Sequence, residues 1–162
     1  YKEKHSEIMK QWYQKNKTAI HKQRLDYYNR NPSVRIARSC RRRISALLKN
    51  KTGSSTKLLG CSYKELSDWL HFQMFLNPSH NMTFDNYGDV WHVDHVIPCA
   101  SFDLTDENQR LKCFHWSNLR PIPKEINLSK GNSIDKIAID EQNEFLLLYC
   151  HTHNMKCIQN NI

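Results

Sequence analysis

Apolar residues are sparse over the first thirty positions of this chain and become regular only further along. Residues 1–30 predict a long polar helix that has too little apolar surface to fold alone. Pro32 interrupts this helix. A second helix is expected over 33–48, where apolar residues recur on one helical face: Ala37, Cys40, Ile44, Leu47 and Leu48. The polar stretch 49–56 then reads as a loop.

From residue 62 onward, the apolar pattern is that of a packed domain. Ser62 and Glu65 have capping-box spacing and predict the start of a helix. Its apolar face holds Leu66, Trp69, Leu70 and Met74, and we expect Phe72 and Phe75 in the same core.

The remaining elements are shorter. Residues 77–89 are irregular, and 91–97 read as a strand. Residues 114–123 read as a short strand or an extended turn, because two prolines disfavour a helix there. Three helices complete the pattern: one over 106–113 capped by Thr105, one over 124–130 ended by Gly131, and one over 139–152 that buries Phe145, Leu148 and Tyr149. This mixture predicts an α+β fold in a mainly helical chain.

Charge divides the chain at the same loop. Residues 1–51 hold 15 Lys and Arg against 3 acids, a net charge of +12, whereas residues 52–162 carry −4. We therefore expect a basic helical arm over 1–51 and a separate domain over 57–162. Such an arm favours a nucleic-acid partner, because phosphate contacts release counterions; the alternative is a solvated charged helix. The arginines expected to contact DNA are Arg35, Arg38, Arg41, Arg42 and Arg43.

The six cysteines include no C-x-x-C pair. We expect reduced thiols that act mainly as small core residues, and no structural zinc. The least implausible zinc set is Cys150, His151, His153 and Cys157. The chain has no apolar run long enough to cross a bilayer and no signal peptide, so we expect an intracellular protein without membrane contact, in the cytoplasm or the nucleus.

The polar residues of the strand WHVDHVIP are the strongest sign of chemistry. Asp94 offers a hard oxygen ligand, and His95 can gain or lose a proton near neutral pH. Asn118, Asn127 and Lys130 follow downstream. Asp and Asn oxygens leave most of a Mg²⁺ shell to water and phosphate. These parts suffice for phosphodiester hydrolysis, although their spacing alone does not establish it.

The motifs VDHVIP and SNLRPIPKEINLSK resemble those of the HNH endonuclease family, whose active site is a ββα-metal module. The segments NYG (86–88), FDL (102–104) and CFHWSNLRP (113–121) resemble its phage and large-virus branch. The resemblance covers residues 60–132. It implies that the strand delivers Asp94 and His95 to a cleft, and we expect a bulge or a twisted strand end there.

The resemblance also assigns roles. It implies that Asp94 and Asn127 are the metal ligands and His95 the general base. Asn118 would hydrogen-bond the backbone and hold the His95 loop in place. An H-N-N set favours Mg²⁺ or Mn²⁺ over later metals. By their chemistry, Arg120 and Lys130 are expected to contact phosphate. His92 is expected to support the site or donate to phosphate, in preference to binding the metal. Cys113 and His115 are expected to pack rather than bind metal.

These expectations define a metal-dependent endonuclease that nicks one DNA strand per active site, as a monomer or homodimer. Its arm would contact the duplex backbone with little sequence reading. Two alternatives stay open: a DNA-binding protein without activity, and a nuclease or binding protein that acts on RNA.

Overall fold

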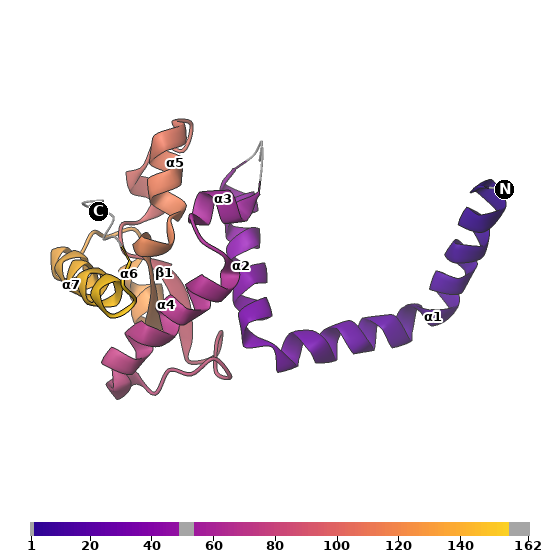
Figure 1. Cartoon of the computed structure of the whole chain (residues 1–162), viewed down its shortest axis with the longest axis horizontal. Coiled ribbons are helices and arrows are strands. Elements are labelled where there is room, and N and C mark those ends of the chain that lie inside the picture. The colour runs from indigo at the N-terminus through magenta and orange to yellow at the C-terminus, as the bar shows by residue number, and fades with distance from the viewer. Residues whose placement is uncertain (1, 49–53, 156–162) are drawn as a thin grey trace.

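Most of the described chain is helical, and its two strands form a short antiparallel hairpin (Figure 1). The computed structural model describes residues 2–48 and 54–155. The architecture is α+β, as the sequence predicts. In chain order the helices and strands are α1 (Lys2–Arg30), α2 (Pro32–Leu47), α3 (Ser55–Leu59), α4 (Tyr63–Leu76), β1 (Trp91–His95), α5 (Glu107–Phe114), β2 (Leu119–Pro123), α6 (Lys124–Lys130) and α7 (Lys136–Thr152).

The β1–β2 hairpin and the helix that follows it make a ββα unit. The strands pair in register from Trp91 opposite Pro123 to His95 opposite Leu119. Both strands of a two-stranded sheet are edge strands, and edge strands tolerate prolines such as Pro121. α6 begins directly after β2 and contacts both strands. The unit therefore brings together the two sequence segments that carry the motif.

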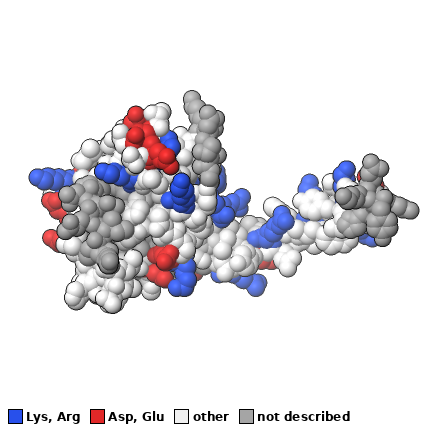
Figure 2. Space-filling view, turned by 45° about the horizontal axis from the view of Figure 1, so that its top comes forward, with Lys and Arg blue, Asp and Glu red and all other residues white. Residues whose placement is uncertain are grey.

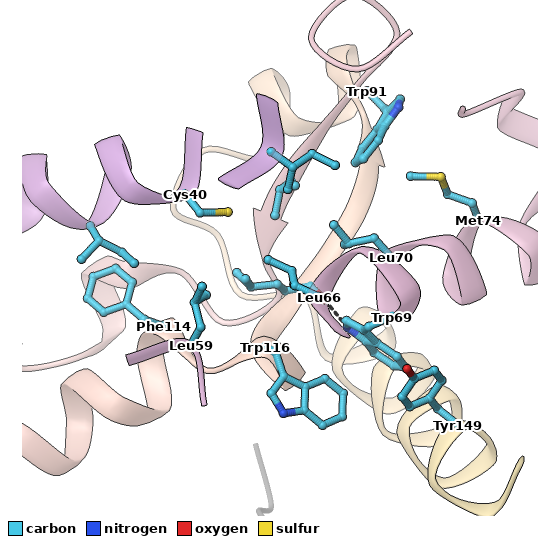
Figure 3. Close-up of a cluster of buried hydrophobic side chains, with 14 of the residues drawn as sticks. Cys40, Leu59, Leu66, Trp69, Leu70, Met74, Trp91, Phe114, Trp116 and Tyr149 are labelled. Atoms are coloured by element: carbon cyan, nitrogen blue, oxygen red, sulfur yellow. Dashed lines mark hydrogen bonds between the residues drawn. The ribbon is translucent and has the colours of Figure 1, made fainter. Parts of the chain in front are cut away.

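α4 supplies the centre of the hydrophobic core (Figure 3). Its predicted capping box is present between Ser62 and Glu65. The Trp69 ring packs edge-on against Trp116 and Tyr149, with ring centroids 5.3 and 5.1 Å away. Other buried side chains of the same cluster come from α2, α4, β1 and α5: Ile36, Cys40, Ile44, Leu66, Leu70, Trp91, Val93 and Phe114.

The carbonyl oxygen of Leu119 anchors the start of β2 to two helices. It accepts hydrogen bonds from Trp69 Nε1 at 2.9 Å, from Gln73 Nε2 at 3.1 Å and from Gln142 Nε2 at 3.1 Å. Gln142 also donates to the carbonyl oxygen of Ser117 at 2.6 Å. Buried polar groups need such partners, so these bonds fix β2 between α4 and α7.

The two basic helices differ in how they meet the rest of the protein. α1 extends away from the body, whereas α2 lies against it (Figure 1). Arg43 of α2 donates to the carbonyl oxygen of Val93, and Arg35 donates to that of Phe84 at 2.7 Å. α1 is long but polar, and within residues 2–48 and 54–155 no helix is apolar enough over sufficient length to span a membrane.

Three burial expectations are wrong. Phe75 is 77% exposed, and Leu47 and Leu148 are each 44% exposed. Each lies on a helix that also carries residues of the buried core. Only a stripe of each helix faces the core, and these three positions fall at or beyond its edge.

The element boundaries also differ in places from the sequence expectation. Asp106, not Thr105, caps α5, because its carboxylate accepts the Gln109 N–H at 2.8 Å. β1 ends at His95 rather than at residue 97, and α7 begins at Lys136 rather than at 139. The helix α3 begins at Ser55, inside the predicted loop 49–56. Such short-range signals leave boundaries uncertain by a few residues.

Leu66→Ala tests the core at the centre of α4. Leu66 is fully buried, so truncation should lower the free energy of unfolding by about 2–5 kcal/mol. Leu147→Ala is the matched control, because Leu147 is 62% exposed and should change it by no more than about 0.5 kcal/mol. Urea denaturation measures both, and equal losses would contradict this description of the core.

Candidate metal and phosphate site

The alternation of β1 divides its polar side chains between two faces. Trp91, Val93 and His95 share the face that packs into the core, and His92 and Asp94 share the face covered by α6. Successive side chains of a strand point to opposite sides. The pairing is continuous through His95, so the expected bulge is absent from this stretch. Asp94 and His95 therefore lie on opposite faces of the hairpin.

Asp94 is a buried carboxylate with two cationic partners. Lys130 Nζ of α6 donates to its Oδ2 at 2.7 Å, and Arg120 Nε of β2 donates to the same oxygen at 3.4 Å. The side chains of Lys130 and Asp94 are only 7% and 9% exposed. A buried charge requires such pairing, because the cost of removing it from water is large.

The ammonium group of Lys130 sits among three oxygen atoms. Besides Asp94 Oδ2, it donates to the carbonyl oxygen of His95 at 2.6 Å and contacts that of Val96 at 3.4 Å. A carboxylate and carbonyl oxygens are also the groups that bind hard metal ions. The end of β1 is thus built to hold positive charge, and Lys130 supplies it here.

His92 and Asn127 form a second pair on the same face. Asn127 Nδ2 lies 3.0 Å from His92 Nδ1, and His92 Nε2 lies 3.3 Å from the carbonyl oxygen of Gly88. A neutral imidazole with its proton on Nε2 satisfies both contacts. With its amide nitrogen directed at His92, Asn127 keeps its side-chain oxygen as an acceptor. Asn127 thus has an amide oxygen, a group of the kind that binds hard metal ions, on the face that holds Asp94.

Asn118 holds the turn that follows β1. Its Oδ1 accepts the Ile97 N–H at 2.9 Å, and its Nδ2 donates to the carbonyl oxygens of Ile97 at 3.1 Å and Cys113 at 2.9 Å. Asn118 is 1% exposed, and its own carbonyl oxygen accepts the Val96 N–H at 2.8 Å. These are the backbone contacts expected of this residue, and they tie the turn to the end of α5.

His95 lies among groups to which the resemblance assigns no catalytic role. Its ring packs edge-on against Phe114 with centroids 5.9 Å apart, and it is 5% exposed. The ligand atoms of His95, Cys99 and Cys113 all lie within 4.8 Å of one another. Sequence reasoning missed this cluster, because Cys99 and Cys113 are far apart in the chain and have no zinc-motif spacing.

The pKa values of the two thiols in this cluster are shifted in opposite directions. A hydrogen bond with Cys113, together with the neighbouring His95, lowers the pKa of the Cys99 thiol. The same hydrogen bond and burial raise the pKa of Cys113 far above its ordinary value. Cys99 is therefore the more readily ionised thiol. His115 lies outside the cluster and hydrogen-bonds Ser117 Oγ at 2.7 Å, and burial lowers its pKa.

The five arginine side chains of α2 make different contacts. Arg35 and Arg43 bind backbone carbonyl groups of the body, as described above. Arg38 lies over the Tyr28 ring at 5.2 Å and Arg41 over the Tyr63 ring at 5.3 Å, which is cation–π geometry. Arg42 is exposed. Only part of the predicted set is thus available to a partner.

A basic hollow connects these helices to the hairpin. It has a volume of about 490 Å³, and its lining includes Tyr28 of α1, Arg38, Arg42 and Arg43 of α2, and His92 of β1. Figure 2 shows basic side chains on the body and along the projecting helix, and the larger acidic patches on the body. The positive surface thus reaches the edge of the ββα unit at His92.

Comparison with known proteins finds relatives but no assigned family. No protein-family model matches the chain, and no solved structure matches it. Two proteins of Acanthamoeba polyphaga mimivirus are similar: "Uncharacterized protein L246", 42% identical over 82% of the chain, and "Uncharacterized protein L426", 34% identical over 86%. The chain spans 56% and 65% of their lengths. The similarity is therefore to larger viral proteins.

Lys130→Met tests the buried ion pair. It leaves Asp94 with Arg120 as its remaining described cationic partner, so the free energy of unfolding should fall by about 3 kcal/mol. Lys64→Met removes a pair with Asp68 of similar length, 3.1 Å, whose lysine side chain is 86% exposed, and should cost at most about 0.5 kcal/mol. Equal losses in urea denaturation would show that burial does not strengthen the Asp94–Lys130 pair.

Proposed function

We propose that this chain is a divalent-metal-dependent endonuclease of the HNH type that hydrolyses phosphodiester bonds of DNA. One observation carries the proposal: the ββα unit gathers a carboxylate, an amide and two cationic side chains on one face, from Asp94, Asn127, Arg120 and Lys130. Side chains of these types can bind a metal ion and phosphate, and they lie on the elements where the sequence motif leads one to expect them. Hydrolysis would leave a 5′-phosphate and nick one strand per active site.

The donor set fits Mg²⁺ or Mn²⁺ in chemical type. Asp94 and Asn127 supply hard oxygens, and both cationic contacts of Asp94 fall on Oδ2. When bound, the ion would stabilise negative charge on the phosphate and on the leaving oxygen. Lys130 must then give up part of its contact with Asp94. Its ammonium group, and the guanidinium of Arg120, would turn toward the phosphate oxygens.

His95 is the proposed base that takes a proton from the attacking water. Its ring faces Phe114 and the two cysteines, so it must rotate, together with a change of the backbone at the end of β1, to reach that water on the α6 face. Asn118 fixes the turn after it and limits the backbone movement that accompanies this rotation. His92 already lies on the α6 face beside Asn127, where it would support the amide ligand.

The basic hollow and α1 would hold the nucleic acid. Arg38, Arg42 and His92 line the same hollow, so a phosphate backbone bound there would lead to the hairpin. Contacts of this type set position rather than sequence. They predict binding that weakens steeply with salt.

A second function has support from one observation. Lys130 and Arg120 already neutralise Asp94, and His95 is buried. A protein that keeps this arrangement permanently would bind DNA or RNA without cutting it. Such a protein needs the same basic surface, so binding alone does not separate the two functions.

A plasmid assay separates them. Supercoiled DNA is incubated with the protein in Mg²⁺, Mn²⁺ or EDTA, and nicked and linear products are measured. Cleavage should require the metal and fall at least about 100-fold in His95→Ala, because a general base contributes that much. His80→Ala is the control, because His80 is exposed and lies outside the site, and it should cut normally.

Three further comparisons sharpen the result. If His92→Ala loses all cleavage and His95→Ala keeps it, the assigned base is wrong. Salt-sensitive DNA binding without cleavage in any metal would favour the binding protein. Cleavage of single-stranded DNA or structured RNA, but not of duplex DNA, would show that duplex DNA is not the substrate. The ratio of nicked to linear product reports whether one or two active sites act together.

A further inference from the structure

The cluster of His95, Cys99 and Cys113 has the composition of a soft-metal site. The histidine ends β1, Cys99 begins the short 3₁₀ turn Cys99–Ser101, and Cys113 lies in the last turn of α5. His95 and Cys113 are buried, and Cys99 is half-buried. Within the described ranges, no other group of three or more His, Cys, Asp or Glu side chains comes together in this way.

The distances suit a single ion. Tetrahedral zinc bonds of about 2.3 Å to sulfur and 2.0 Å to nitrogen put neighbouring ligand atoms roughly 3.5–3.8 Å apart. The three ligand atoms already lie within 4.8 Å of one another, so small side-chain rotations complete the geometry. Two thiolates would balance the charge of a Zn²⁺ ion, which limits the cost of placing it in the core beside Arg43.

The backbone around the cluster is fixed in advance. Asn118 hydrogen-bonds both Ile97, in the turn between His95 and Cys99, and the carbonyl oxygen of Cys113. One buried side chain therefore sets the spacing of the two segments that carry the thiols. A site whose supporting groups are held this way loses little conformational freedom when it binds a ligand.

We propose that His95, Cys99 and Cys113 bind one Zn²⁺ ion, and that the bound ion holds His95 on the core face and so inhibits cleavage. Binding would form one metal–nitrogen and two metal–sulfur bonds and release the thiol protons to solvent. The ligands separate this site from the oxygen set of Asp94 and Asn127, because thiolates select softer metals. The inhibition rests on the proposed nuclease function, whereas the binding does not.

Metal binding is tested first, without reference to activity. Co²⁺ replaces Zn²⁺ in the reduced protein, and thiolate-to-cobalt absorption is titrated while native mass spectrometry counts the ions. One ion per chain is expected, with affinity at least about 10-fold lower in Cys99→Ser and in Cys113→Ala. Cys61→Ser is the control, because Cys61 is a half-buried free thiol outside the cluster.

Two outcomes overturn the metal site. One is the absence of thiolate-to-cobalt absorption in the reduced wild-type protein. The other is unchanged affinity in both Cys99→Ser and Cys113→Ala. The use of two variants covers the case in which the buried Cys113 position does not accept a change, because Cys99 is only half-buried. A Cys99–Cys113 disulfide that persists under reducing conditions would also exclude the site.

Inhibition is tested with the plasmid assay in excess Mg²⁺. One equivalent of Zn²⁺ should slow the wild-type protein and Cys61→Ser at least about 10-fold, with each rate compared with that of the same variant without zinc. Cys99→Ser and Cys113→Ala should lose this sensitivity. Equal inhibition in all variants would contradict the proposal that zinc inhibits cleavage by holding His95 on the core face. If no variant cleaves even without zinc, the proposed function fails, and the cobalt titration alone decides the metal site.

Discussion

The alternation of side chains along β1 is the constraint on which the rest of the site depends. It sends His95 into the core with Val93 and sends Asp94 to the face under α6. Asp94 and His95 are adjacent in the motif but therefore lie in different environments. Asp94 lies beside the cationic groups of Lys130 and Arg120, whereas His95 lies beside two thiols and the Phe114 ring. The hairpin can hold this division because α4 and α7 fix β2 through the carbonyl oxygen of Leu119.

The positively charged partners of Asp94 are the second feature that determines what the site can bind. Asp94 has its cationic partners within the chain, Lys130 and Arg120, so a metal ion that binds Asp94 must compete with Lys130. That competition makes the proposed activity sensitive to small changes at the end of α6. In the proposed reaction it would also couple metal binding to phosphate binding, because a phosphate group would offer Lys130 a new partner if the metal bound Asp94.

Local signals in the sequence predicted the local features of the fold. The capping box of Ser62, the break at Pro32 and the hairpin strands each follow from a short pattern, and the resemblance led to the backbone role of Asn118. The sequence did not predict that Arg35 and Arg43 dock α2 onto the body, or that Lys130 binds Asp94. Nor did it predict the cluster of His95, Cys99 and Cys113. Each joins segments distant in the chain, and only tertiary packing brings them together.

The measurement that tests the central claim most directly is the location of bound Mn²⁺ by NMR. Mn²⁺ is paramagnetic and broadens the amide signals of nearby residues. At substoichiometric Mn²⁺, signals of residues 92–96 and 124–130 should broaden first, and Asp94→Asn should remove the effect. Broadening that is strongest elsewhere, or that persists unchanged in Asp94→Asn, would contradict the assignment of the ββα unit as the hard-metal site.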